Sequence, residues 1–392
     1  MKTPGSNLLT RVAPVLRGLL AEATGDDDRP WRPVLLRSLP GEKGAGTFCR
    51  NGPSGCCAQK VPDPFSPLRL APLAPDLTDE ALRARLAEAL ARYEAEHRAK
   101  PEIVCLPEVA VFQVTRPAPL PAHDPRLANK VALVTGAAGA IGYGICRGLL
   151  SRGCHLAITD LPGEKLDSFA AEFQKLDPER TLSVPMDVTD SASVTRAFAE
   201  IIGRWGGLDI VAINAGIALT GPLTGLELDA FRRLERVNVE GTLLTLAESG
   251  RLFARQGTGG DVVLVSTKNV CAPGAGFGAY SATKAAAHQL ARIASLEFAP
   301  IGVRVNMVAP DAVFSGGGHQ SGLWAEVGPG RMKARGLDQQ GLEDYYRNRN
   351  LLKARVTAEH VANAVLFFAT RQTPTTGACL PVDGGLPDAT PR

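Results

Sequence analysis

Tyr280 and Lys284 are the residues whose types and spacing most clearly suggest chemistry. They lie four positions apart on a predicted helix, so their side chains project from the same face, one turn from each other. A tyrosine is a poor base because its ordinary pKa is about 10, but a neighbouring ammonium group favours the phenolate and lowers that pKa. The pair could therefore exchange a proton with a hydroxyl group near neutral pH. The alternative is that both side chains lie on a solvent-facing helix and have no catalytic role.

A glycine-rich segment between residues 136 and 142 could bind a phosphate. It follows an apolar run expected to be a strand, residues 131–135, and precedes a helix expected to begin near Tyr143. In such a turn, backbone N–H groups can approach a pyrophosphate closely, and the positive end of the helix faces the same point. The residues expected to hold a dinucleotide there are Gly136, Gly139, Ala140, Ile141 and Gly142.

Two carboxylates follow the next two predicted strands. Asp160 can accept hydrogen bonds from ribose hydroxyls and would repel a 2′-phosphate, so it predicts NAD rather than NADP as the cofactor. It could instead cap the turn formed by residues 161–163. Asp187, with Val188 after it, is placed to reach the adenine amino group, although it could equally be a turn residue before Thr189.

From residue 126 onward, the sequence indicates the strands and helices that would position these side chains. Short runs of Val, Ile, Leu and Ala alternate with longer helical stretches, as in VALVTG, LDIVAINA and VRVNMVAP. Apolar runs without strict alternation indicate strands buried on both faces of a parallel sheet. With right-handed crossovers, this pattern predicts an α/β, doubly wound parallel sheet (Rossmann fold) whose ligands bind at the carboxyl ends of the strands.

Four motifs occur in order along residues 127–386. They are Thr135-Gly136 with Gly142, Asn214-Ala215-Gly216, Tyr280-Ser281-Ala282-Thr283-Lys284 and Val382-Asp383-Gly384-Gly385. Together they resemble the short-chain dehydrogenase/reductase family. The resemblance implies hydride transfer between an alcohol and NAD, with Tyr280 as proton acceptor or donor and Lys284 also bound to the nicotinamide ribose. It extends the expected cofactor contacts to Asn214, Ala215, Gly216, Tyr280 and Lys284.

Other positions take their expected roles from the same resemblance. The family's substrate-binding serine falls thirteen residues before the tyrosine, where this sequence has Thr267. Ser266 is the alternative if the loop bulges, because adjacent strand side chains face opposite ways. Asn238 matches the asparagine that holds a water linked to the lysine, and Lys268 and Asn269 could line the pocket, although surface exposure is the safer expectation. The remaining cofactor contacts are expected at Pro310, Val313 and Ser315, the last facing the nicotinamide amide.

A narrower resemblance concerns the substrate. Ser-Thr-Lys-Asn at 266–269, Pro-Asp-Ala-Val at 310–313 and Tyr-Tyr-Arg at 345–347 are similar to dehydrogenase domains fused behind a class II aldolase-like domain. Fusions of the rhamnulose-phosphate aldolase/alcohol dehydrogenase type are the model. This resemblance implies a polyol, a sugar-derived alcohol or a hydroxyaldehyde as substrate. Residues 316–350 would form the lid over it, and they are more polar than a steroid or lipid pocket needs.

Residues 1–125 differ from the rest of the chain, and the sequence assigns them no role. We interpret them as a partly ordered N-terminal extension of the NAD-binding domain, residues 126–392, and as a possible truncated aldolase-like remnant. They contain only two histidines, whereas aldolases of that class hold a divalent metal with several. Within them, an amphipathic helix is expected at Asp79–His97 and one or two short strands at 102–114.

Composition limits the classes of partner. The 392 residues are 45% hydrophobic and 21% charged with a net charge of +3, and no basic cluster predicts binding to nucleic acid or to an anionic membrane. No run of 18 apolar residues could span a bilayer, and arginines interrupt the N-terminal segment, so we expect a cytoplasmic protein without a signal peptide. Cys49, Cys56 and Cys57 cluster, but nothing nearby completes four ligands, so no metal site is expected.

The expected partner is a small-molecule alcohol or carbonyl compound. By family resemblance, two long helices near 229–255 and 280–299 would also join copies of the chain into a homodimer or homotetramer. Two other functions stay open from the sequence. One is an NADPH-dependent carbonyl or 3-ketoacyl reductase, against which Asp160 argues. The other is a nucleotide-binding regulatory module without catalysis, against which the intact Tyr280 and Lys284 pair argues.

Overall fold

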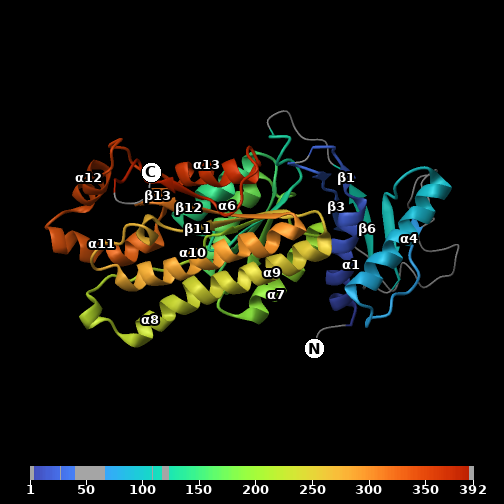
Figure 1. The fold of residues 1–392 in the computed structure, drawn as a ribbon, viewed down its shortest axis with the longest axis horizontal. Coiled ribbons are helices and arrows are strands. Elements are labelled where there is room, and N and C mark those ends of the chain that lie inside the picture. The colour runs from blue at the N-terminus through green and yellow to red at the C-terminus, as the bar shows by residue number, and fades with distance from the viewer. Residues whose placement is uncertain (1–3, 27, 40–66, 108, 117–122, 388–392) are drawn as a thin grey trace. The chain divides into compact units, whose positions relative to one another are not determined.

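Figure 1 shows the computed structural model, which describes residues 4–26, 28–39, 67–107, 109–116 and 123–387. The chain divides into two compact units. The smaller contains Met1–Ala118, Phe198–Leu208 and Arg251–Thr258, and the larger contains Pro119–Ala197, Asp209–Gly250 and Gly259–Arg392. The three clustered cysteines of the N-terminal region lie outside the described residues.

A seven-stranded parallel sheet forms the centre of the larger unit. Its order is β15-β12-β11-β10-β7-β8-β9, so β7, which comes first of these seven strands along the chain, lies inside the sheet. Every residue of β7, β10 and β11 is buried, as expected for strands covered on both faces. The strands are β7 (Val131–Val134), β8 (His155–Asp160), β9 (Thr181–Pro185), β10 (Ile210–Ile213), β11 (Gly260–Val265), β12 (Val303–Pro310) and β15 (Cys379–Val382). The predicted doubly wound parallel sheet is confirmed.

Helices cover both faces of this sheet. Figure 1 shows α6 and α13 on one side and α7, α9 and α10 on the other. α5 packs against α13 on the first side, where Leu149, Phe169 and Val365 form part of a core that excludes water. The helices are α5 (Ala140–Ser151), α6 (Glu164–Leu176), α7 (Ser191–Trp205), α9 (Gly241–Gln256), α10 (Gly278–Phe298) and α13 (Ala358–Ala369).

Two helices differ from their predicted forms. The helix after the glycine-rich turn begins at Ala140 rather than near Tyr143, because the Tyr143 N–H already donates to the Gly139 carbonyl at 2.8 Å. The long helix predicted over 229–255 consists of α8 (Leu228–Glu235), a π-helical turn over Arg236–Glu240, and α9. The wider turn is a local departure from regular helix of the kind often found at functional sites.

The smaller unit has its own sheet, and its described N-terminal residues include the helices α1 (Pro4–Leu20) and α4 (Asp79–His97). The predicted bounds of α4 are confirmed: the Thr78 hydroxyl caps its first turn, and Leu82, Leu86, Leu90 and Tyr93 are buried as one stripe. The predicted strands at 102–114 are confirmed as two. The sheet has the order β3-β6-β5-β4, and its strands are β3 (Leu35–Ser38), β4 (Leu68–Arg69), β5 (Ile103–Leu106) and β6 (Ala110–Thr115).

The segment predicted as a lid has regular structure in the larger unit. It consists of the short pair β13 (Ser315–Gly316) and β14 (His319–Gln320), followed by α11 (Gly322–Arg335) and α12 (Gln339–Arg349). Among the described residues, no helix is both long enough and apolar enough to cross a bilayer.

Candidate active site

A cavity of about 1050 Å³ opens where β7 and β10 lie side by side. The chain leaves β7 toward β8 and leaves β10 toward β11, so the connections part on opposite sides of this point. The amide of Asn214 closes the base of the crevice, donating to the carbonyls of Thr135 at 3.1 Å and Gly136 at 2.7 Å. The Thr135 hydroxyl in turn accepts from the backbone N–H groups of Asn214 and Ala215. The sheet therefore supplies a rigid floor for the cavity.

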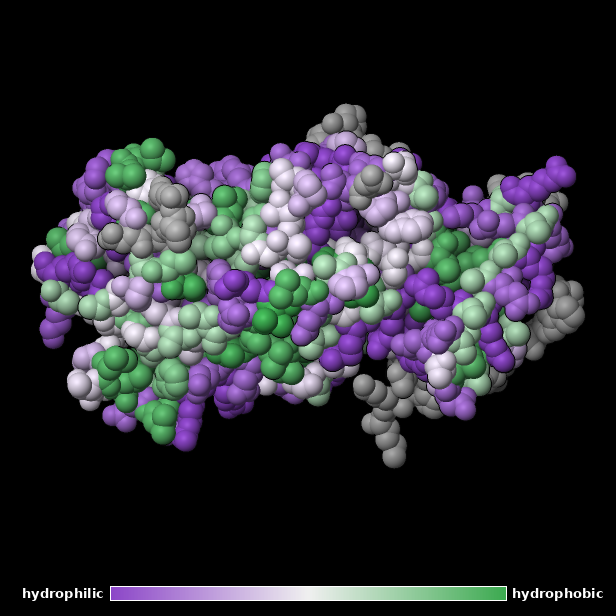
Figure 2. All heavy atoms as spheres, in the orientation of Figure 1, coloured by the Kyte–Doolittle hydropathy of each residue, from purple (hydrophilic) through white to green (hydrophobic). Residues whose placement is uncertain are grey.

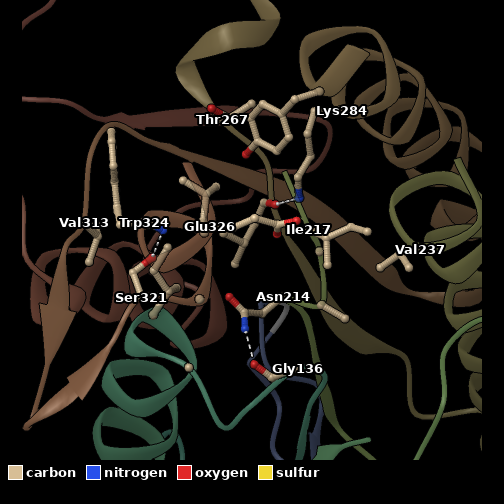
Figure 3. Close-up of a pocket in the computed structure, with 18 of the residues that line it drawn as sticks. Gly136, Asn214, Ile217, Val237, Thr267, Lys284, Val313, Ser321, Trp324 and Glu326 are labelled. Carbon is tan, nitrogen blue, oxygen red and sulfur yellow. Dashed lines mark hydrogen bonds between the residues drawn. The ribbon is translucent and has the colours of Figure 1, made fainter. Parts of the chain in front are cut away.

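Most residues predicted as functional line this one cavity. Figure 3 shows Gly136 and Asn214 on one side, Thr267 and Lys284 opposite, and Val313, Ser321 and Trp324 along a third side. The predicted residues that line it are Gly136, Gly139, Ala140, Ile141, Gly142, Asp160, Asp187, Val188, Asn214, Ala215, Gly216, Thr267, Tyr280, Lys284, Pro310 and Val313.

Two predicted residues do not line the cavity. Ser315 is exposed in β13, where it pairs with Gln320, and it does not face the position expected for a nicotinamide. Ser321 lines the wall instead, and its hydroxyl accepts from the Trp324 N–H at the start of α11. Asn238 is fully buried behind the wall. The sequence analysis did not identify Ser321, because residue order alone does not show which side of a short hairpin faces the cavity.

The glycine-rich turn fits a dinucleotide. Gly136 has φ +57°, and a Cβ there would lie 2.6 Å from the Cα of Ala215. A Cβ at Gly142 would lie 2.2 Å from the Ala137 carbonyl oxygen. Gly139 is different, because its φ is −125° and an added Cβ would meet nothing within 4 Å. The first two glycines are required by the fold, whereas the open space at Gly139 is room for a ligand to approach the backbone at the start of α5.

The two carboxylates after β8 and β9 both line the cavity and both hold the backbone. Asp160 accepts from the N–H of Ala138 at 2.9 Å and from that of Leu161 at 2.8 Å, so it braces the glycine-rich turn as well as its own. Asp187 accepts from the backbone N–H and the hydroxyl of Thr189. Each carboxylate oxygen can accept more than one hydrogen bond, so both groups keep capacity for a ligand.

Tyr280 and Thr267 meet at the catalytic end of the cavity. Tyr280 lies on α10 and is 6% exposed, and Thr267 is the second residue after β11. Burial raises the pKa of the Tyr280 phenol to about 12, while the hydrogen bond with the Thr267 side chain acts to lower it. The neighbouring Ser266 hydroxyl instead makes a 3.0 Å hydrogen bond with His288. Of the two adjacent hydroxyls, Thr267 is therefore the one in contact with the phenol.

Lys284 is as deeply buried as Tyr280, but its ammonium group is bound elsewhere. Its Nζ donates to the Val265 carbonyl at 3.0 Å, and burial lowers the pKa of Lys284 to about 8. The sequence-based expectation that Lys284 lowers the pKa of Tyr280 is not met in this state. Removal from water has the largest effect on the pKa of both side chains, because neither has a charged partner among the described residues that would offset it.

Asn238 fixes the backbone beside Lys284. Its amide oxygen accepts from the Ile217 N–H, and its amide nitrogen donates to the Ile217 carbonyl and to the Thr283 hydroxyl, each at 3.0 Å. A Cβ on Gly216 would lie 3.1 Å from Lys284 Nζ and 3.2 Å from Asn238 Oδ1. Asn238, from the π-helical turn, and Lys284 thus both lie close to Gly216, and they fix the position of this part of the cavity lining.

The lid is attached to the rest of the larger unit at both of its ends. At the α12 end, Arg349 forms a bidentate pair with Asp311, the residue after β12, at 2.5 Å and 2.7 Å, and the Asp311 side chain is only 7% exposed. At the hairpin end, His319 lies 3.0 Å from Glu172 of α6, with these side chains 29% and 41% exposed. Between these ends, Phe314, Trp324 and Tyr346 pack ring against ring, and Trp324 and Tyr346 face the cavity.

Lys268 and Asn269 lie in the cavity wall, contrary to the expectation of surface exposure. A short 3₁₀ turn over Lys268–Val270 follows Thr267, whose side chain accepts from the Asn269 N–H. This turn leaves Asn269 6% exposed, and burial together with the charges of Arg349 and Arg331 lowers the pKa of Lys268. Of the two alternatives left open by the sequence, the pocket position is the one found, because the direction of the turn depends on the cap at Thr267.

Comparison with known proteins finds dehydrogenases and other oxidoreductases. A family model described as short chain dehydrogenase matches residues 130–323. Sorbitol dehydrogenase of Cereibacter sphaeroides is 33% identical over 51% of this chain and 76% of that protein. The oxidoreductase YuxG of Bacillus subtilis is 36% identical over 69% of this chain, which spans only 39% of the length of YuxG. The crystal structure of sorbitol-6-phosphate 2-dehydrogenase SrlD from Erwinia amylovora, 26% identical, matches 65% of this chain and 98% of its own with a TM-score of 0.60.

The glycines provide a matched pair for testing the cavity. Gly139→Ala should unfold in urea like the unchanged protein, because nothing opposes a Cβ there, yet raise the Kd for NADH, read by its fluorescence, about tenfold or more. Gly136→Ala should lose about 2 kcal/mol or more of stability, because both φ and the Ala215 backbone oppose it. If Gly139→Ala bound NADH as tightly as the unchanged protein, the dinucleotide would not lie over this turn.

Proposed function

Because the chain belongs to the short-chain dehydrogenase family, we propose that it oxidises a polyol, a sugar-derived alcohol or a hydroxyaldehyde with NAD. As a member it is an NAD(P)-dependent oxidoreductase of CH–OH groups. The observation that carries the finer proposal is that Tyr280, Thr267 and Lys284 are all buried and all line the cavity that the glycine-rich turn also lines.

The proton chemistry follows from these three side chains. Tyr280 would take the proton from the substrate hydroxyl in oxidation and return it in reduction, with the Thr267 hydroxyl holding the substrate oxygen. NAD, when bound, supplies the hydride acceptor and a positive charge beside the phenol. Because burial alone raises the pKa of Tyr280 to about 12, charge close to the phenol has to favour the phenolate before it can act as a base. Lys284, held at the Val265 carbonyl, is positioned to contribute once a cofactor ribose offers it another partner.

Support for the substrate class comes from the relatives and from the lid. Relatives are named for sorbitol, L-2,3-butanediol and glucose, all small hydroxylated molecules. The cavity wall opposite the cofactor floor also carries charged and polar groups. They are Lys268, Asn269, Asp311, Ser321, Glu326, Arg331 and Arg349. Such a wall suits a hydroxylated substrate better than a hydrocarbon one.

Tyr280 can be tested by removing one oxygen atom. Tyr280→Phe should lower turnover by about 10³-fold, because it deletes the proton acceptor, while the NADH Kd stays unchanged. Thr267→Ser should keep most activity and Thr267→Ala should lose about 10²-fold, since only serine retains the hydroxyl. The assay is NADH production over polyols, sugars, lactaldehyde and secondary alcohols, with Tyr345→Phe, a tyrosine outside the cavity lining, as control.

The outcomes separate the alternatives. Turnover above a tenth of normal in Tyr280→Phe would remove Tyr280 from the chemistry. NADH binding by the unchanged protein with no turnover of any alcohol or carbonyl compound would favour the regulatory module. Activity only in the direction of carbonyl reduction with NADPH would favour the reductase.

Asp160 is proposed to select NAD. Asp160→Ala should lower the ratio of kcat/KM for NAD to that for NADP about tenfold or more, because the carboxylate that repels a 2′-phosphate is gone. Asp167→Asn, an exposed carboxylate on α6 outside the cavity lining, should leave the ratio unchanged. An unchanged protein that already uses NADP as well as NAD would contradict the assignment.

We also propose a homodimer or homotetramer joined through α9 and α10. Apolar side chains on these helices are exposed, with Leu243 at 49%, Ile293 at 42% and Leu296 at 71%. Figure 2 shows hydrophobic residues gathered along the two helices. Burial of such a surface would stabilise the association of two copies.

Sedimentation tests the assembly. Leu296→Arg should reduce the mass measured by analytical ultracentrifugation, because it places a charge in the joined surface. Leu176→Arg, at a position 53% exposed on α6, should leave the mass unchanged. An unchanged protein that sediments as a single chain would rule out the assembly.

A further inference from the structure

Lys268 presents a cation directly beside the catalytic hydroxyl. It follows Thr267 in the chain and lines the cavity, and its Nζ donates to the Ala272 carbonyl at 2.9 Å. An ammonium group has three donors, so this bond leaves two for a ligand. Within the described part of the chain, no carboxylate forms an ion pair with Lys268.

Arg331 brings a second cation to the same wall from the lid. Its guanidinium lies 4.9 Å above the ring of Phe277, which is itself 6.1 Å from the ring of Tyr280. Its terminal nitrogens make only long contacts of 3.4 Å, with the Tyr346 hydroxyl and the Ala275 carbonyl. Its Nε is buried with no hydrogen-bond partner among the described residues. Arg331 therefore has donor capacity that the protein does not use.

The charge of this wall is not balanced by its carboxylates. Arg349 is neutralised by Asp311, which leaves Lys268 and Arg331. Glu326 also lines the cavity, but among the described side chains it forms no ion pair with either cation. Burial is the largest cause of the lowered pKa of Lys268; the charges of Arg349 and Arg331 lower it further, and the Asp311 carboxylate offsets only part of that effect. Holding like charges together in a half-buried wall is unfavourable unless an anion joins them.

An unused acceptor belongs to the residue after Lys268 and lines the same cavity. The side-chain oxygen of Asn269 is buried and has no hydrogen-bond partner within the described structure, although Asn269 lines the cavity and is 6% exposed. A buried acceptor of this kind costs free energy until a donor reaches it. A hydroxyl on the ligand would supply that donor.

We propose, on the basis of the proposed dehydrogenase function, that Lys268 and Arg331 bind an anionic group of the substrate while Asn269 accepts from a neighbouring hydroxyl. The anionic group is a carboxylate or a phosphate. Lys268 follows Thr267 in the chain, and the ring of Phe277 lies between Arg331 and Tyr280. The anionic group is therefore carried by a part of the substrate away from the carbon that is oxidised. The substrate class is thereby narrowed to hydroxylated acids or phosphate esters, such as a sugar acid or a polyol phosphate.

The kinetic test compares three matched substrates: a neutral polyol, its phosphate monoester and the corresponding sugar acid. The unchanged enzyme should prefer one or both anionic compounds to the neutral one. Lys268→Met and Arg331→Gln should each lower kcat/KM for the preferred anionic compound about 10- to 100-fold, because each removes a charge-assisted contact. Both variants should lose less kcat/KM for the neutral polyol than for the anionic compound, so the ratio of the two kcat/KM values should fall about tenfold or more. Lys333→Met, an exposed lysine of the same helix as Arg331 and outside the cavity lining, is the control.

The outcomes distinguish the two anions and the two levels of the proposal. Preference for the phosphate ester or for the sugar acid identifies the group. Equal use of neutral and anionic compounds, or an equal loss for both in the two variants, would overturn the subsite. If no compound is turned over, the proposed function fails, and binding then tests the subsite alone. Inorganic phosphate or malonate should raise the Tm of the NADH complex, and Lys268→Met and Arg331→Gln should abolish that increase, whereas no increase in the unchanged protein would contradict the subsite.

Discussion

The contact between the turns that follow β7 and β10 determines where every functional group of the larger unit lies. The Asn214 amide joins these turns by binding two successive carbonyls, and Gly136 approaches Ala215 so closely that no Cβ fits between them. Parallel strands alone would leave the separation of the two turns free to vary. With this contact made, the start of α5 and the segment 214–216 have one relative position. Gly216 is then within reach of Lys284 and Asn238, which extends the same constraint to the catalytic end.

The sequence was sufficient for the architecture and for the gathering of most site residues. Uninterrupted apolar runs predicted strands buried on both faces. Because the carboxyl ends of parallel strands lie at the same edge of the sheet, the polar residues that follow those runs were expected to lie close together. Asp160 was found in this way, whereas Asn214 and Thr267 were assigned from the family resemblance. The spacing of Tyr280 and Lys284 required only the geometry of a helix. Periodicity also located α4 correctly, although it gave no role for the smaller unit.

The parts that sequence could not supply depend on contacts between distant residues. The partner of the Lys284 ammonium is the Val265 carbonyl, nineteen positions earlier, and nothing local to Lys284 indicates it. The π-helical turn around Asn238 forms where Ile217 and Thr283 can both be reached by one amide. Lys268 and Asn269 turn inward because Thr267 caps a 3₁₀ turn. Ser315, expected to face the cofactor, pairs with Gln320 in a short hairpin, and Ser321, for which the sequence predicted no role, lines the cavity.

The two attachments of the lid are unequal. The Asp311–Arg349 pair is bidentate and largely buried, so dissolved salt screens it weakly. The His319–Glu172 contact is more exposed, and its attraction depends on whether the imidazole carries a proton. The hairpin end is therefore the more weakly held of the two, and rising ionic strength weakens its attachment more than it weakens the buried pair at the α12 end.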